Sequence, residues 1–122
     1  LHTALDSAEE QAKAGKHVLL LVDSLTRLVR AYREAGLSAG ELPVRHGYPV
    51  SVFSELPKLL ERTGNFESSS ITAFFTVLLS GELNEDPFVE EVKSLTDGHI
   101  TLSRAQAERG IYPAIDLLSS LS

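Results

Sequence analysis

Asp23 is the first residue in this chain whose type and position suggest chemistry. It follows an uninterrupted apolar run, Val18 to Val22, which predicts a strand buried on both faces, as in parallel sheets. In open α/β sheets the carboxyl end of such a strand is where ligands bind, and an acid there can hold magnesium through water in a nucleotide site. Alternatively, Asp23 or Ser24 simply caps the helix that follows. The motif leaves both interpretations open.

Three further side chains have functional potential. Arg27 and Arg30 lie three residues apart on one face of the helix predicted after the first strand. They could contact phosphates or a neighbouring subunit, or they could pair with Glu34 on the same helix. Tyr112 could offer its flat ring to a nucleotide base, or it could pack in the core.

Several common catalytic patterns are missing from the sequence. Residues 1–122 contain no Gly-x-Ser-x-Gly nucleophile motif and no Gly-x-x-x-x-Gly-Lys-Ser/Thr phosphate loop. The absence of cysteine excludes disulfides and thiolate metal sites. The histidines are scattered and are expected at surface or edge positions rather than as metal ligands. They are His2, His17, His46 and His99.

The bulk composition is that of one small globular domain. The chain has 122 residues, of which 43% are hydrophobic and 23% charged. A net charge of -6 argues against a surface built to bind nucleic acid through phosphate contacts. No apolar run is long enough to span a membrane, and the N-terminal stretch LHTALDSAEEQAKAGKH lacks the apolar region of a signal peptide. We therefore expect a soluble cytoplasmic protein, peripheral to a membrane at most.

Alternating helix and strand patterns predict an α/β fold. Because helices separate the strands, we expect a mostly parallel sheet with helices on both faces. The second strand should end near Leu78 to Gly81, beside the end of the first. The predicted helices cover residues 3–14, 25 to the EAG at 34–36, 51–63, 87–95 with Asp86 as cap, and 103–109; the strands cover 17–22, 69–80, 99–102 and a β-like stretch within 110–122; a loop covers 37–49.

Three stretches carry a family resemblance, and they are VLLLVDSLTRLVRAYREAGLSAGELPVRHGYPVSVFSELPKLLERTG, SSITAFFTVLL and DGHITLSRAQAERGIYPAIDLLSSLS. Together and in unbroken order, they resemble the export ATPases of bacterial flagella and type III secretion systems. That family is related to the rotary ATP synthase β subunit and has a RecA-like catalytic core. LVDSLTR is similar to the family's magnesium-site strand, GELPVRHGYPVSVF to its pore-side loop, and GIYPAID to its adenine-pocket segment. The resemblance covers roughly residues 16–122, and its specificity lies in the ordered combination of motifs.

The resemblance implies roles for individual residues. Asp23 would order Mg²⁺ and water at the terminal phosphates of ATP, and Arg27 would lie near the active site or its interface. Tyr112 would stack against adenine. Gly40 to Tyr48 would face the central channel of a homo-hexameric ring, where an export stalk or secreted substrate is contacted. Stator proteins would be further partners.

The resemblance also implies that residues 1–122 form a single partial RecA-like domain, from the magnesium-site strand to the adenine-pocket segment. The family's phosphate loop and catalytic glutamate would precede residue 1, and its interface arginine would follow Ser122. We therefore expect the isolated chain to be inactive and prone to association or disorder. Two departures from the family pattern, Val50 and Gln106, do not alter the expected fold.

Three alternative functions stay open at this point. LLLVDSLTRLVRAYREA also resembles the equivalent strand and helix of Rho-type helicases, and the closing segment is shared with rotary ATP synthase or vacuolar-type subunits. Residues 37–62 favour the export family over these enzymes. The third alternative is a non-catalytic structural half-domain. The sequence does not distinguish a flagellar from an injectisome ATPase.

Overall fold

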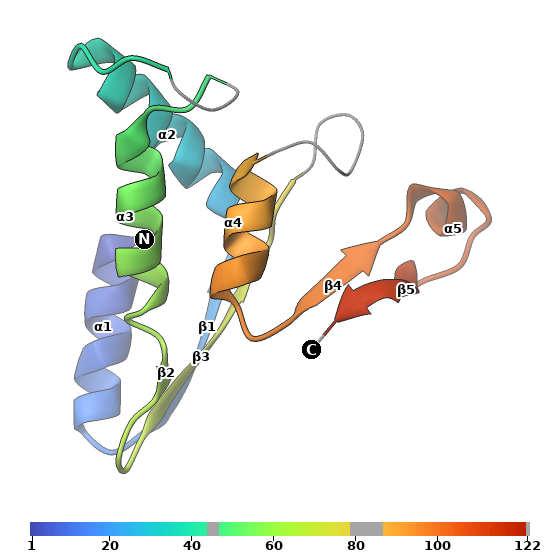
Figure 1. Ribbon diagram of the computed structural model, residues 1–122. Helices are drawn as coiled ribbons and strands as arrows, with labels where there is room; N and C mark the ends of the chain where they lie inside the picture. The colour runs from blue at the N-terminus through green and yellow to red at the C-terminus, as the bar shows by residue number, and fades with distance from the viewer. Residues whose placement is uncertain (44–46, 79–86, 122) are drawn as a thin grey trace. The chain divides into compact units, whose positions relative to one another are not determined.

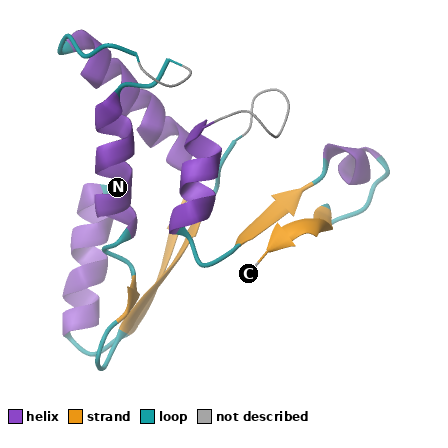
Figure 2. Ribbon diagram, viewed as in Figure 1, coloured by secondary structure: helices purple, strands orange, loops and turns teal. Residues whose placement is uncertain are grey.

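The computed structural model describes residues 1–43, 47–78 and 87–121. The chain divides into two compact units, Leu1–Val89 and Glu90–Ser122, each of which is described by itself. Both units combine helices and strands, so the predicted α/β class is confirmed (Figure 1, Figure 2). Within the described ranges, no helix is both long and apolar enough to cross a membrane.

The elements of the first unit follow the predicted order closely. The two-residue strand β2 was not among the predicted elements. The elements are α1 (His2–Lys13), β1 (His17–Val22), α2 (Leu25–Ser38), α3 (Val50–Leu60), β2 (Gly64–Asn65) and β3 (Ser70–Phe75), and α4 (Pro87–Leu95) crosses the boundary into the second unit.

The parallel pairing of β1 and β3 is the centre of the first unit. His17 lies opposite Ser70 and Val22 lies opposite Phe75, so the two strands end side by side. The sequence predicts this placement, but with the second strand ending later, near Leu78 to Gly81. β2 pairs antiparallel with β3, which gives the order β1-β3-β2. A parallel pair needs a long crossover between its strands, and α2 and α3 both lie within this one.

One face of this sheet packs against the helices. Leu20 of β1 and Ile71 of β3 are buried together with Leu59 of α3. Figure 1 shows α1 and α3 along the same side of the two strands. A fully buried aliphatic side chain contributes about 1.5–3 kcal/mol, so this cluster is a main source of the unit's stability. α1 adds residues at the i, i+3, i+7 spacing of one helix face, namely Leu5, Ala8 and Ala12.

The other face of the sheet differs from the prediction. β1 was expected to be buried on both faces, but Leu19 and Leu21 are 61% and 70% exposed, and Phe74 of β3 is 56% exposed. These side chains alternate with the buried ones because successive residues of a strand point to opposite faces. Helix cover on both faces is therefore not observed among the described residues.

α2 continues beyond its predicted end at 34–36 and stops at Ser38. Its stop is Gly40, which adopts a left-handed φ of 91°. The Gly40 N–H bonds to the carbonyl of Leu37 and the Glu41 N–H to the carbonyl of Gly36. This is the Schellman pattern, in which glycine follows the last helical residue. Gly36 lies inside the helix, where a Cβ atom would clash with Glu41 and with the start of α3.

The second unit corrects the expectation of a mostly parallel sheet. It contains β4 (His99–Leu102), α5 (Arg104–Glu108) and β5 (Ile115–Leu121), in addition to most of α4. β4 and β5 pair antiparallel, with Leu102 opposite Ile115, because the short connection through α5 reverses the chain. Among the described strands, β1 and β3 alone are parallel.

Some predicted features fall outside the described residues. They are the end of the second strand at 79–81, the Asp86 cap, His46 and the middle of the 37–49 loop.

Arg62 ties the chain after α3 to α1. Its Nε donates to Glu9 Oε1 at 2.7 Å and its Nη2 donates to Asp6 Oδ1 at 2.5 Å. Asp6 and Glu9 lie three residues apart on α1, so one guanidinium fork reaches both. The hydrogen bond from Arg62 lowers the pKa of Glu9 below its usual range, and the bonds to both carboxylates raise the pKa of Arg62.

Replacing Arg62 with glutamine should reveal this ion-pair network through its pH dependence. A lowered folded-state pKa means that Glu9 stabilises the fold above its ordinary pKa of 4.5, and that this stabilisation is lost as pH falls through the lower value. We expect Arg62→Gln to lower the urea midpoint near neutral pH, with a shrinking difference from the parent chain below the ordinary pKa. Lys58→Gln, which removes an exposed pair with Glu55, is the control. A difference independent of pH would contradict the assignment.

The exposed outer face of β1 should make the isolated chain associate. We expect the parent chain to sediment faster than a monomer, because adjacent exposed leucines form an apolar patch. The double variant Leu19→Thr, Leu21→Thr should shift sedimentation towards the monomer. Leu42→Thr, which changes a leucine that is 80% exposed outside the sheet, should leave the association unchanged. A monodisperse parent chain would show that this face does not drive association.

Candidate functional site

Asp23 lies where the sequence predicts, directly after β1. Its carboxylate Oδ1 accepts a hydrogen bond from the Thr76 hydroxyl at 2.7 Å. Thr76 follows β3, and its own N–H donates to the Val22 carbonyl at 3.0 Å, while its carbonyl accepts from Leu25 N–H at 2.9 Å. The backbone of Thr76 therefore holds the β1–α2 turn on both sides of Asp23. This leaves an exposed carboxylate in a defined position at the carboxyl edge of the parallel strands.

The alternative that Asp23 or Ser24 caps α2 is wrong. Ser24 occupies the N-cap position with extended backbone angles, but no side chain makes a cap hydrogen bond there. Its hydroxyl is instead buried and finds no hydrogen-bond partner among the described residues. Of the two interpretations of Asp23, a ligand-binding acid or a helix cap, only the ligand-binding acid is left.

Two threonines that the sequence analysis missed organise this edge. Thr76 orients Asp23, and the Thr26 hydroxyl accepts from the Leu78 N–H at 2.8 Å. The parallel register of β1 and β3 is the feature from which the position of Thr76 beside Asp23 could have been predicted. Because Val22 pairs with Phe75, the next residue of each strand comes to the same edge. Predicting it required the correct end of β3, which the sequence analysis placed at residue 80.

Arg27 lies in the first turn of α2, close in the chain to Asp23. Its side chain is exposed, as is that of Arg30. Among the described residues neither arginine forms an ion pair, so the expected pairing with Glu34 is not observed. The two guanidinium groups are available to an anionic ligand or to a neighbouring molecule.

Tyr112 belongs to the second unit, whereas Asp23 and Arg27 belong to the first. Its ring is 75% exposed, so the alternative that it packs in the core is wrong. The ring face is free for stacking. The structure thus brings Asp23 and Thr76 into contact, with Arg27 following in the first turn of α2, and it presents Tyr112 as an exposed aromatic group of the second unit.

The chemistry of Asp23 suits magnesium better than a metal held by several side chains. Within residues 1–43, 47–78 and 87–121, no three histidine or acidic residues gather into a metal-binding group. His17 Nδ1 lies 2.9 Å from the Ser70 hydroxyl, and His99 Nε2 donates to the Ser119 carbonyl at 3.1 Å, so each histidine contacts its neighbouring strand. Magnesium commonly keeps several waters and uses one or two carboxylates plus substrate phosphates. A single oriented carboxylate fits that pattern.

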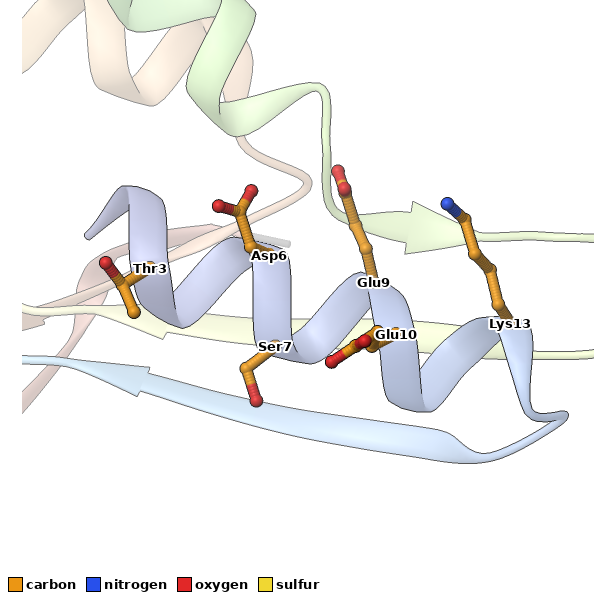
Figure 3. A pocket seen from close by; sticks show the side chains of 6 residues that line it. All are labelled: Thr3, Asp6, Ser7, Glu9, Glu10 and Lys13. Carbon is orange, nitrogen blue, oxygen red and sulfur yellow. The ribbon is translucent and has the colours of Figure 1, made fainter.

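A shallow hollow of about 460 Å³ lies along α1. Figure 3 shows Asp6, Glu9 and Lys13 projecting from one side of the helix and Ser7 and Glu10 from another. All of its lining residues come from this one helix, and two of its acids are already paired with Arg62. The hollow contains none of the predicted site residues and is not the candidate site.

Comparison with known proteins identifies relatives along the whole chain. The model of the ATP synthase alpha/beta family, nucleotide-binding domain, matches residues 1–122. A type 3 secretion system ATPase of Xanthomonas euvesicatoria is 57% identical over 115 residues, covering 94% of this chain and 26% of the relative. A flagellum-specific ATP synthase of Treponema pallidum (strain Nichols) is 54% identical over 121 residues, covering 99% of this chain and 27% of the relative.

Solved structures give the same result. The assembled ATPase EscN from the enteropathogenic E. coli type III secretion system superposes with a TM-score of 0.95 at 52% identity, covering 98% of this chain and 29% of that one. EscN in complex with its central stalk EscO gives a TM-score of 0.88 at 52% identity, with 98% and 28% coverage. The chain thus spans between a quarter and a third of the length of these proteins.

Replacing Ser24 with alanine tests the site's local structure. Removing a serine N-cap usually costs about 1 kcal/mol, but this hydroxyl makes no hydrogen bond to any residue that the structure describes, so we expect Ser24→Ala to be neutral or slightly stabilising. Ser103→Ala is the matched control, since the Ser103 hydroxyl accepts from Gln106 N–H at 3.3 Å and caps α5. Amide exchange should accelerate in α5 of the control and stay unchanged in α2 of Ser24→Ala. Faster exchange in α2 would mean that Ser24 caps the helix.

Proposed function

The chain belongs to the ATP synthase alpha/beta family, in its nucleotide-binding domain, and from this premise we propose that it is part of an ATPase that energises protein export. The apparatus would be a flagellar or type III secretion system. The observation that carries this proposal is the identity above 50% to export ATPases over nearly the whole chain. That level of identity favours the export branch over the helicase and rotary synthase alternatives.

Asp23 is the proposed acid of the active site. It would order Mg²⁺ through water at the terminal phosphates of ATP, where the ion neutralises charge that develops during phosphoryl transfer. The hydrogen bond from Thr76 supports this role, because it fixes the orientation of the carboxylate before any ligand arrives. Thr76 is accordingly a positioning residue, acting through Asp23.

Arg27 is the proposed basic group beside this acid. Its exposed guanidinium, without an ion-pair partner among the described residues, is suited to a phosphate oxygen or to an acidic group of a neighbouring subunit. Tyr112 is the proposed wall of the adenine pocket. Its exposed ring supports this role, since stacking on a base is worth about 1 kcal/mol beyond burial.

The architecture we propose for the enzyme is a RecA-like domain of which residues 1–122 form one part. Other parts of the enzyme would supply the phosphate loop, the catalytic glutamate and the interface arginine, and would extend the parallel sheet and cover its exposed face. On this proposal the isolated chain does not hydrolyse ATP, because the groups that bind and position the γ-phosphate come from elsewhere.

The proposed assembly is a homo-hexameric ring on the cytoplasmic side of the export apparatus. The related ATPase EscN is known as an assembled ATPase and in complex with its central stalk EscO, and this supports the same arrangement here. The Gly40 to Tyr48 segment would face the central channel. A stalk, stator proteins and secreted substrates would be the partners.

The role of Asp23 can be tested in the full-length ATPase that carries these residues. We expect Asp23→Asn to lower kcat by about 100-fold or more, because it removes the charge that orders the metal. Thr76→Val should lower kcat about 10-fold or more, because it removes one hydrogen bond to a carboxylate. Thr72→Val, which changes an exposed threonine within β3, should keep full activity. Full ATP turnover in Asp23→Asn would overturn the proposed function.

A further inference from the structure

The connection between α2 and α3 runs from Ala39 to Pro49, and its N-terminal end is hydrogen-bonded to α2. After the reversal at Gly40, the Glu41 N–H bonds to the Gly36 carbonyl at 3.1 Å. Gly36 is buried, and a Cβ there would lie 2.7 Å from Glu41 Oε2 and 2.9 Å from both Pro49 Cγ and Ser51 Oγ. Glu41 and the start of α3 therefore pack directly on the backbone of α2. Glycine at position 36 makes this approach possible.

Glu41 also supplies a cap for α3. Pro49 occupies the N-cap position of that helix and makes no side-chain cap hydrogen bond. Glu41 Oε1 instead accepts from the backbone N–H of Ser51, in the first turn, at 3.3 Å. Negative charge is favourable at this end of a helix. One carboxylate thus contacts the N-terminus of α3 and the surface of α2 at Gly36.

The C-terminal end of the connection packs against α2 and α3 through Tyr48. Its ring is 9% exposed, and the Arg33 guanidinium of α2 lies 5.4 Å from the ring centroid. The ring also meets Phe53 of α3 edge to face, at a centroid distance of 6.0 Å. Arg33 lies three residues before Gly36 on α2, so adjacent turns of this helix hold the two ends of the connection.

α2 links the contacts of this connection to the candidate site at Asp23. The helix has 14 residues and is therefore about 21 Å long. It begins directly after Asp23 and Ser24, with Leu25 N–H bonded to the Thr76 carbonyl. Figure 1 shows α2 running from the carboxyl end of β1 to the connection. A regular helix moves as a rigid body, since shortening it breaks backbone hydrogen bonds.

We propose that Glu41 is a positioning residue for ATP turnover, acting through α2 on Asp23. Its carboxylate sets the placement of α2 against α3, and α2 in turn sets the edge that holds Asp23, Thr76 and Arg27. This inference rests on the proposed function. Loss of the carboxylate should alter the catalytic step more than adenine binding, because α2 leads to Asp23 and carries no residue assigned to the adenine pocket.

The test measures kcat and KM for ATP in the full-length ATPase with Glu41 replaced. Glu41→Gln keeps an oxygen that can accept from Ser51, so its kcat should stay within about 2-fold of the parent. Glu41→Ala removes the acceptor, and Glu41→Asp moves it away from Ser51 because its side chain is one methylene shorter. Each should lower kcat about 5-fold with little change in KM, since the loss of a helix cap corresponds to a factor of about this size. Glu61→Ala, an exposed glutamate at the other end of α3, is the matched control and should behave as the parent.

The outcomes separate this inference from the proposed function. Parental kcat in both Glu41→Ala and Glu41→Asp overturns the inference, while loss of turnover in Asp23→Asn in the same assay leaves the proposed function standing. Full turnover in Asp23→Asn overturns both. An equal fall in kcat for Glu41→Gln and Glu41→Ala, with lowered thermal midpoints, shows a folding role and also overturns the inference. If Glu41→Ala does not fold, Glu41→Asp, which keeps the charge, gives the same comparison.

Discussion

The parallel pairing of β1 and β3 is the constraint on which the candidate site depends. Its register sets Val22 opposite Phe75, so the next residues, Asp23 and Thr76, meet at the same edge and form a hydrogen bond. The same register aligns the buried residues of both strands towards α1 and α3. A shift of one residue would turn the buried set to the other face and separate the acid from its threonine. Core packing and the geometry of the site are therefore specified together.

Part of this arrangement could be predicted from the sequence, because the apolar run and the acid that ends it are local signals. Asp23 was correctly placed at the end of a strand, and the two central strands were correctly expected to end side by side. Thr76 was missed because hydrophobic patterning does not mark where β3 stops: the apolar run continues past Phe75 although the pairing does not. The roles of Asp23, Arg27 and Tyr112 in ATP chemistry remain predictions from resemblance.

The errors in the predicted fold have physical causes that lie outside local patterning. An apolar run of five residues indicates burial on two faces, but it cannot indicate what covers each face, and Leu19 and Leu21 are exposed here. The helical period predicts an end for α2 within the EAG at 34–36, because the apolar pattern does not continue past it. Gly36 instead admits Glu41 and Pro49, and Gly40 makes the stop. The antiparallel pairing of β4 and β5 likewise follows from a short return through α5, which helix and strand periodicity do not encode.

The two backbone hydrogen bonds between Thr76 and the β1–α2 turn have an evolutionary consequence. Both backbone bonds are made by the main chain of Thr76, directly after β3, and the Ser24 hydroxyl makes none among the described residues. The turn should therefore tolerate changes of side chain at Ser24 while tolerating no change in its length. An inserted or deleted residue between Val22 and Leu25 would move one of these two partners out of reach. Among homologues, position 24 should vary in residue type, while the segment stays free of gaps.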